Sequence, residues 1–320
     1  MKGSTYLFLP TLFLAALLNG CRNPSPDSAE GASVKAAQYF AGEPVQLDDY
    51  WYQGKAEISS YTLSQNRYRG VHPGEAVLIF VTEDFLVDEQ VKDESGGGPA
   101  STTVLKTNSL RRFTTGIYDY SIMTSVFTPV EVQTHPYTLK VTTSSQDWCG
   151  QTWMQVNREA RHYRTSLYSY FESEGDREGR TPLAPLEDEL YNRIRINPQR
   201  LPTGEFEMLP GTAYCRLMHL PFKAAPAKAA LEAYQGDRFE GTDLRAYRLH
   251  YPGLERTLTI VFETETPHRI AGWVEAYPSL SDGVIRETVA THVKTVRNAY
   301  WQHNNREDRT MRQELQLQGR

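Results

Sequence analysis

The sequence predicts a mainly β protein, in which a large curved antiparallel sheet forms a half-open barrel or a sandwich. A few helices, one of them C-terminal, close an edge of this sheet. Three observations support this class. The chain has 19 Tyr, and Thr and Val are also plentiful, which favours strands over helices. Strand patterns rarely alternate with helical patterns, which argues against a doubly wound α/β fold. Pairs such as Pro210-Gly211 and Pro252-Gly253 mark turns between short strand-like segments.

About a dozen segments have the composition or the alternation of strands, and the central pair is the clearest. Residues 139–143 are rich in β-branched side chains, Gly150 breaks the run, and Thr152, Met154 and Val156 then alternate with other residues. This pattern predicts a hairpin with a tight turn. The expected strands are residues 50–68, 76–82, 102–115, 116–132, 139–143, 152–156, 162–171, 205–209, 213–219, 245–251, 256–262 and 269–276.

Helical spacing predicts a small number of helices. In the last of them, apolar residues four apart starting at Ile285 share one helical face, and Ser281-Asp282 supplies the N-cap. The expected helices are residues 34–40, 186–194, 227–234 and 285–300. Turns and loops are expected over residues 71–75, 88–101 and 172–180, and the polar tail 304–320 is expected to fray.

The start of the chain has the pattern of an export signal. Met1-Lys2 is positive, and the apolar run 6–18 is shorter than the roughly 20 residues that a membrane-spanning helix needs. Leu18-Asn19-Gly20-Cys21 follows and resembles the lipobox of bacterial lipoproteins. This resemblance implies that residues 1–20 are a signal peptide, and that acyl chains such as palmitate on Cys21 hold the protein to a membrane. Because Arg22 and not Asp follows the cysteine, the resemblance also implies the outer membrane, with the protein facing the periplasm.

Composition divides the remaining chain into three parts. Residues 21–40 are expected to be a tether, residues 41–303 a single β-rich domain, and residues 304–320 a polar tail. The formal net charge is −5, and removal of Lys2 with the signal peptide makes it −6. An acidic chain has no bulk electrostatic reason to bind nucleic acid, so we expect no such partner. Of the three cysteines, Cys149 and Cys215 remain after Cys21, and they either form a disulfide or stay free with one buried.

The predicted hairpin turn carries the first candidate for a catalytic site. Cys149 lies near Asp147 in the sequence. Its thiol is expected to act as a nucleophile if folding brings a histidine close to it. The alternative is that Cys149 is a small buried residue at a tight turn. The histidines available for catalysis are His135, His162 and His219.

Aromatic residues around the same hairpin form a candidate binding surface. Tyr118, Tyr120, Trp148 and Trp153 have the flat faces on which a sugar, a lipid tail or a partner protein stacks. Of the two tryptophans, we expect Trp148 at the surface and Trp153 in the core.

Two groups of carboxylates have the residue types of glycoside hydrolysis or Ca²⁺ binding, but they lie in a predicted loop and in the first turn of a helix. They are Glu172, Glu174 and Asp176, and residues 187–189. The chain has no His-x-x-x-His pair, Gly-x-Ser-x-Gly motif, P-loop or dinucleotide fingerprint. We therefore expect no metal and no cofactor.

Two resemblances bear on function. Ser109-Leu110-Arg111-Arg112 resembles part of the signature of the Maf nucleotide pyrophosphatases, which implies ligand-binding roles for Arg111 and Arg112 on an α/β fold. A wider resemblance covers nearly the whole mature chain. It is to a family of uncharacterised Gram-negative outer-membrane lipoproteins, some of which carry the label septum formation inhibitor Maf, transferred in error. It rests on residues 50–61, 111–125, 146–152 and 171–176, and it implies location and a single folded unit but no activity.

Taken together, these patterns favour a lipid-anchored envelope protein that acts as a non-enzymatic binding or interaction module. An envelope protein, a lipid or a glycan is the expected ligand. The alternatives are a periplasmic hydrolase that uses Cys149 or a carboxylate cluster and, less favoured, a Maf-type nucleotide pyrophosphatase. The expected binding residues are Tyr118, Tyr120, Trp148, Trp153, Arg111 and Arg112.

Overall fold

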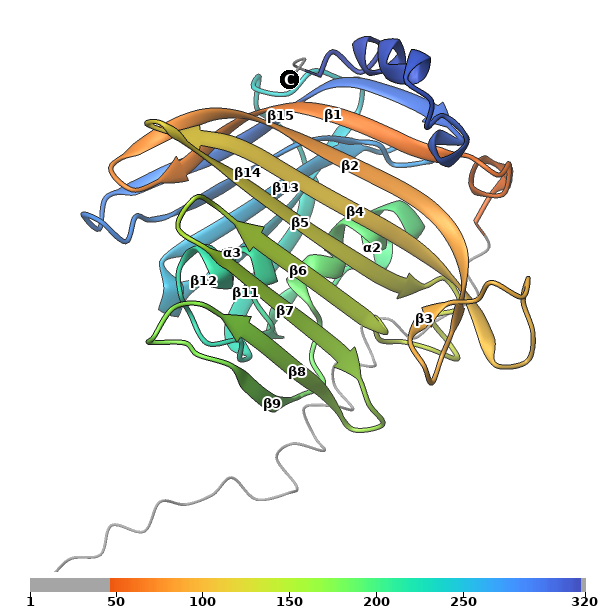
Figure 1. Cartoon of the computed structure of the whole chain (residues 1–320), viewed down its shortest axis with the longest axis horizontal. Helices are drawn as coiled ribbons and strands as arrows, with labels where there is room; N and C mark the ends of the chain where they lie inside the picture. Colours follow the sequence, from red (N-terminus) through yellow and green to blue (C-terminus); the bar gives the residue numbers. More distant parts are fainter. Residues whose placement is uncertain (1–46, 318–320) are drawn as a thin grey trace, which may run out of the picture.

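The computed structural model describes residues 47–317, and all the strands in this part belong to one antiparallel sheet (Figure 1). The prediction of a mainly β fold is therefore confirmed. The fifteen described strands are β1 (Ala56–Arg67), β2 (Gly70–Leu86), β3 (Val91–Lys92), β4 (Ser101–Thr115), β5 (Tyr118–Pro129), β6 (Lys140–Gln146), β7 (Gln151–Arg158), β8 (His162–Ser169), β9 (Arg177–Pro182), β10 (Gly204–Met208), β11 (Ala225–Ala233), β12 (Leu244–Tyr251), β13 (Arg256–Glu263), β14 (Ile270–Pro278) and β15 (Ile285–Asn298).

Across the sheet the strands follow the order β10-β11-β12-β13-β14-β15-β1-β2-β4-β5-β6-β7-β8-β9, and β3 pairs with β2. The edge strands β10 and β9 do not pair with each other, so the described sheet is not closed. The segments that follow them meet at one parallel bridge between Leu186 and Leu209. Because successive strands are antiparallel, the β1–β2, β4–β5, β6–β7, β8–β9 and β14–β15 turns lie at one end of the sheet (left in Figure 1). We call it the hairpin end.

Two short helices, α2 (Leu190–Ile196) and α3 (Thr212–Leu217), lie against the concave side of the sheet (Figure 1). The predicted helix at 186–194 is therefore confirmed. Leu190 and Ile194 are one turn apart and fully buried, and they belong to a core that also contains Phe80 and Leu249 from distant strands. The 3₁₀ turns are η1 (Asp49–Trp51), η2 (Glu187–Glu189), η3 (Pro198–Arg200), η4 (Pro252–Leu254), η5 (Tyr300–Gln302) and η6 (Glu307–Gln313).

Two segments that we predicted as helices are strands, so the prediction of a C-terminal helix is wrong. Residues 227–234 lie mostly in β11 despite their helix-forming alanines, because β10 and β12 pair with this segment on both sides. Residues 285–300 lie mostly in β15, between β1 and β14. Apolar residues four apart share a face in a strand as well as in a helix, so their spacing did not distinguish a strand from a helix here. Asp282 stabilises a turn, since its carboxylate accepts a hydrogen bond from the Val284 backbone N–H at 3.2 Å.

Most predicted strands are present, and the errors have local causes. The strand predicted at 213–219 is wrong, because α3 occupies Thr212–Leu217, and Asp188 of η2 accepts the backbone N–H of Thr212 at 2.9 Å. The turn predicted at 71–75 lies inside β2, because the chain turns at Tyr68, which has a positive φ. At Gly74 a Cβ would overlap the backbone of Arg112 on β4, so this glycine allows close strand approach. The predicted loop 172–180 contains the start of β9.

The two ends of the chain differ in what the structure describes. The lipidation site Cys21, the tether 21–40 and the helix predicted at 34–40 lie outside the described residues. The prediction that the chain frays from residue 304 is wrong for Leu315, which is buried against Ile58 and Val81. The Ser60 hydroxyl also donates a hydrogen bond to the Leu315 carbonyl at 2.6 Å. No helix within residues 47–317 combines the length and the apolar character needed to cross a bilayer.

Candidate functional site

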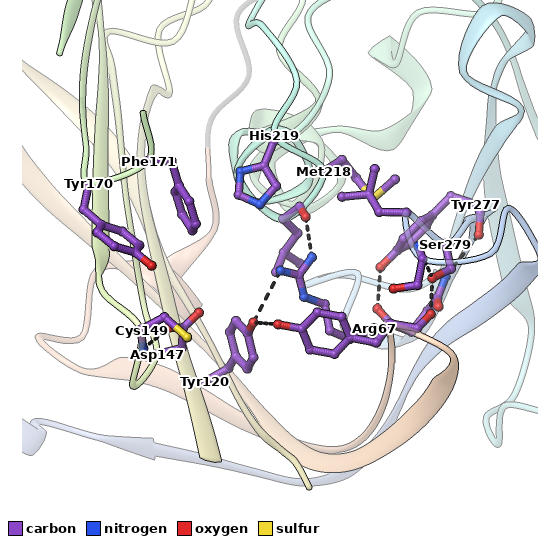
Figure 2. Close-up of a pocket in the computed structure, with 15 residues that line it drawn as sticks. Arg67, Tyr120, Asp147, Cys149, Tyr170, Phe171, Met218, His219, Tyr277 and Ser279 are labelled. Atoms are coloured by element: carbon purple, nitrogen blue, oxygen red, sulfur yellow. Dashed lines mark hydrogen bonds between the residues drawn. The ribbon is translucent and has the colours of Figure 1, made fainter. Parts of the chain in front are cut away.

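A cavity of about 230 Å³ opens at the hairpin end (Figure 2). Segments that are far apart in the sequence meet there, because the antiparallel order brings their turns to the same end of the sheet. The cavity is smaller than the roughly 300–1,000 Å³ of pockets that hold drug-sized ligands, so it suits a ligand of about one ring. Residues from four turns and from the segment after α3 line it: Tyr68, Asp147, Cys149, Tyr170, Leu280 and His219.

Three tyrosines form a connected wall beside the cavity. Tyr120 is buried, and its ring stacks on Phe113 with centroids 4.7 Å apart. The Tyr68 hydroxyl lies 2.7 Å from the Tyr120 hydroxyl and accepts a hydrogen bond from Tyr118 at 2.7 Å. Burial raises the pKa of Tyr120, so its hydroxyl stays protonated at neutral pH. Of the three, Tyr68 and Tyr120 line the cavity, and Tyr118 is connected to them through the Tyr68 hydroxyl.

Arg67 lies in the middle of the cavity wall (Figure 2). It was not among the site residues predicted from the sequence. Its guanidinium donates to the Leu217 carbonyl and, at 3.3 Å, to the Tyr120 hydroxyl. The guanidinium carbon also lies 4.7 Å from the centre of the Tyr68 ring. The Nε atom of Arg67 is buried and has no hydrogen-bond partner among residues 47–317; the same holds for Oδ1 of Asn66, which also lines the cavity.

Cys149 lies in a tight turn at the edge of the cavity and is exposed, so the expectation of a small buried residue is wrong. The Asp147 carboxylate shapes this turn by accepting the backbone N–H groups of Cys149 at 2.6 Å and Gly150 at 3.2 Å. The negative charge of Asp147 raises the pKa of the Cys149 thiol. Nucleophilic catalysis needs the thiolate, and Asp147 therefore acts against it.

The two described cysteines, Cys149 and Cys215, are free. Of the two arrangements left open by the sequence, free thiols with one of them buried are therefore observed. Cys215 is buried in α3, and burial raises the pKa of its thiol to about 12. Cys215 is consequently a structural residue in this fold.

His219 lines the cavity, but its ring is held by neighbouring groups. Its Nδ1 atom lies 3.2 Å from the buried carboxylate of Glu174, and its ring packs edge-on against Phe171 with centroids 4.5 Å apart. Glu174 also pairs with Arg216 at 3.0 Å and accepts the Ser169 hydroxyl at 2.6 Å. Glu174 therefore organises one wall of the cavity, and it is not a solvated loop carboxylate.

The two tryptophans lie on different sides of the sheet. Trp148 is 69% exposed at the tip of the hairpin, and its ring is 6.5 Å from that of Tyr118. Trp153 is half-buried and packs against Tyr168 at 5.5 Å, while its neighbours Thr152 and Met154 are buried on the opposite face. The expected exposure of Trp148 is confirmed. Trp153 is not in the inner core and does not line the cavity.

Arg111 and Arg112 are adjacent in β4, so their side chains point to opposite faces of the sheet. Arg111 is inside, where its guanidinium pairs with Glu275 at 2.8 Å. Arg112 is partly exposed and lies 3.8 Å from Glu75. The pair suggested by the Ser-x-Arg-Arg motif therefore does not converge on one ligand.

Buried ion pairs fill much of the concave side. Arg256 is fully buried and bonds bidentately to Glu187, at 2.5 and 2.7 Å, and to Glu275 at 3.2 Å. Beside this network lies an interior cavity of about 40 Å³ that has room for a few water molecules at most. Asp188 lines it, and burial raises the pKa of this carboxyl to about 7. The space is too small for a substrate, so the carboxylates at 187–189 organise the core.

The site residues that sequence reasoning missed are Asn66, Arg67 and Tyr170, whereas His219 was named as one of three histidines available for catalysis. Asn66 and Arg67 end β1, Tyr170 lies in the β8–β9 turn and His219 follows α3, so no local motif joins them. A usable signal was nevertheless present, because alternate turns of an antiparallel meander lie at the same end. Grouping polar and aromatic residues by alternate turns would have placed Tyr68, Trp148 and Tyr170 together.

Among residues 47–317 no cluster of three or more His, Cys, Asp or Glu side chains is arranged to hold a metal ion. No protein-family model matches the chain, and no curated protein and no solved structure shows significant similarity to it. The proposed function therefore rests on the geometry of the cavity.

Proposed function

We propose that this chain is a lipid-anchored binding protein of the bacterial outer membrane, facing the periplasm, and that it holds its ligand in the cavity at the hairpin end. One observation carries this proposal. The cavity combines the aromatic rings of Tyr68 and Tyr170 with polar side chains such as Asp147 and Ser281. Aromatic faces together with a few polar groups are typical of sites that bind small molecules.

The chemistry of these groups favours a saccharide. A sugar hydroxyl both donates and accepts a hydrogen bond, so one ring can pair with polar lining groups such as the Asp147 carboxylate and the Ser281 hydroxyl. The aromatic faces of Tyr68 and Tyr170 offer apolar surface for the flat side of a ring. The volume of about 230 Å³ agrees with a ligand of about one ring.

Binding is better supported than hydrolysis for two reasons. The Asp147 charge raises the pKa of Cys149 and disfavours a thiolate nucleophile. The carboxylates of Glu174, Glu187 and Glu189 each pair with a buried arginine, which leaves them poorly placed to act on a ligand. For the fold, we propose a half-open barrel and not a sandwich, because one unbroken ladder of strands curves around α2 and α3 (Figure 1).

The anchoring part of the proposal rests on Leu18 to Cys21 and is tested separately. The full chain and its Cys21→Ala variant are expressed in a Gram-negative host with an alkyne fatty acid. The full chain is expected to carry the label and to sediment with outer membranes, and the variant is expected to lose the label and either to leave the membranes or to remain as an uncleaved precursor. Label that persists on Cys21→Ala would contradict the lipobox assignment.

The binding part is tested by thermal unfolding of purified, detergent-solubilised protein with a panel of soluble saccharides. The panel contains glucose, mannose, galactose, N-acetylglucosamine and the disaccharide of N-acetylglucosamine. A sugar present at 100 times its Kd adds about 2.7 kcal/mol of stability, which corresponds to a rise in Tm of about 5 °C for a domain of this size.

Two tyrosines close together in the chain provide a matched pair of variants. Tyr170 lines the cavity, whereas Tyr168 packs on Trp153 on the other side of the sheet. Tyr170→Ala is expected to abolish the rise in Tm, and Tyr168→Ala is expected to keep it. The proposal is wrong if no sugar of the panel raises Tm, or if Tyr170→Ala responds as the unchanged protein does.

A further inference from the structure

The most exposed apolar side chains of the described structure gather at one end. Seven large apolar residues within 47–317 are at least half exposed, and six of them lie at the hairpin end. Ile117 is 82% exposed and Trp148 is 69% exposed. We call these six residues the apolar rim: Ile117, Trp148, Tyr170, Leu280, Val284 and Ile285.

The apolar rim follows the mouth of the cavity. Its residues belong to the β14–β15, β4–β5, β6–β7 and β8–β9 turns, and the β1–β2 turn between them contributes Tyr68. These five turns are neighbours along the sheet, and four of them also line the cavity (Figures 1 and 2). Tyr170 and Leu280 belong to both the rim and the cavity wall. The exposed apolar surface is therefore continuous with the interior of the cavity.

The fold itself does not need apolar groups at these tips. Single exposed apolar residues are common in soluble proteins, but six of them on neighbouring turns beside one cavity indicate a surface that is covered when the protein functions. The groups stand on separate hairpin tips and do not form one flat patch. Such tips can enter the headgroup layer of a bilayer one by one, and Trp and Tyr are favoured in that layer.

We infer that the apolar rim rests on a lipid bilayer, so that the cavity opens towards the membrane and receives its ligand from there. This inference rests on the proposed function, and it narrows the ligand to a saccharide carried on a lipid. The occupant of the rim is the bilayer, because the expected anchor keeps the protein within reach of one at all times.

The length of chain between anchor and domain permits this orientation. Twenty-six peptide steps separate Cys21 from Leu47, and they span at most about 90 Å when fully extended. The longest strand, β2, has 17 residues and spans about 56 Å. The 3₁₀ turn η1, which begins two residues after Leu47, lies at the end opposite the hairpin end (right in Figure 1), where the Trp51 carbonyl accepts the Thr82 hydroxyl. The chain is therefore long enough for the hairpin end to turn back to the bilayer that holds Cys21.

Quenching of tryptophan fluorescence tests this orientation on the lipidated protein. The mature protein is reconstituted into vesicles of phosphatidylethanolamine and phosphatidylglycerol, with and without brominated acyl chains. Bromine quenches only tryptophans that approach the acyl region. Trp148 is on the rim, whereas Trp301 is partly exposed near the end of β15, away from the rim. Trp148→Phe and Trp301→Phe are therefore matched surface variants.

Brominated lipid is expected to quench the unchanged protein and Trp301→Phe, and quenching is expected to fall at least threefold in Trp148→Phe. A second measurement uses an unlipidated chain of residues 22–320, for which Ile117→Ser is expected to lower partition into the same vesicles by about tenfold. Tyr52→Ser, which changes an exposed residue away from the hairpin end, is expected to have no effect.

Equal quenching in Trp148→Phe and the unchanged protein, or quenching that disappears only in Trp301→Phe, would overturn the inference. The saccharide measurement is made without vesicles, so the two proposals fail separately. A sugar-dependent rise in Tm without rim quenching would reject only the membrane orientation. Quenching at Trp148 without any sugar response would reject the saccharide site.

Discussion

Replacing Asp188 by Asn is expected to remove a large part of the pH dependence of stability. Asp188 is buried beside the interior ion-pair network, and its carboxylate accepts the Thr212 backbone N–H at 2.9 Å and the Thr212 hydroxyl at 3.0 Å. Burial and, to a lesser extent, the charge of Glu187 raise the pKa of this carboxyl to about 7, while the Thr212 hydrogen bonds and Arg111 oppose the shift. An amide keeps one oxygen for Thr212 and cannot ionise.

The direction of this pH dependence follows from the difference in proton binding between the folded and the unfolded protein. Between pH 4 and pH 7 the folded protein holds a proton on Asp188, and the unfolded chain, with a pKa near 3.8, does not. This contribution to stability is present at low pH and is lost as pH rises through 7. The interval from 3.8 to about 7 corresponds to about 4 kcal/mol in total, of which about 2.5 kcal/mol is lost between pH 5 and pH 8.

Urea unfolding at pH 5, 6, 7 and 8 measures this effect as the difference between Asp188→Asn and the unchanged protein. Burial lowers the pKa values of His135, His268 and His292, so these residues act in the opposite direction below pH 6.5. The contributions of these histidines to stability are the same in both proteins, so they cancel when the two free energies of unfolding are subtracted. Asp188→Asn is expected to become more stable relative to the unchanged protein by about 2.5 kcal/mol as pH rises from 5 to 8. If the free energies of unfolding of the two proteins change in parallel between pH 5 and pH 8, the role given to Asp188 is refuted.

Three further changes test other parts of the structure. Arg195→Met leaves the buried Glu57 carboxylate without its guanidinium partner and is expected to cost about 3–5 kcal/mol in urea unfolding, and adding Glu57→Gln should recover much of that loss. Trp148→Ala is expected to change the free energy of unfolding by less than about 0.5 kcal/mol, because the side chain is mostly exposed, and a larger loss would place it in the core. A disulfide reagent at pH 7 is expected to label Cys149 in the native state more slowly than it labels free cysteine, because Asp147 raises the thiol pKa; faster labelling would favour the nucleophile.

Sequence patterns predicted the fold wherever local periodicity and the final pairing agreed. The β6–β7 hairpin was predicted because Thr152, Met154 and Val156 alternate and Gly150 lies at the turn. The strands β11 and β15 were not predicted. The alanines of β11 and the apolar residues four apart in β15 also fit the local pattern of a helix. Strand pairing decided these segments, because each lies between two neighbours that supply backbone hydrogen bonds.

The candidate site was predictable only in part. Tyr120, Asp147 and Cys149 were found because they lie in or near one conspicuous hairpin. Arg67 was not found, because its partners Leu217 and Tyr120 are 150 and 53 positions away in the chain. The sequence also suggested a shared role for Arg111 and Arg112, although neighbours in a strand point to opposite faces.

By itself the sequence determined the β class, most of the strands and the exposed position of Trp148, because composition, alternation and turn residues act over a few positions. The tertiary structure alone decided which turns meet around a cavity, which carboxylates are buried against arginines, and which polar atoms remain unpaired. These properties depend on contacts between residues far apart in the chain. Arg256 shows the reason, since its charge is tolerated in the core only because Glu187 and Glu275 arrive from other segments to pair with it.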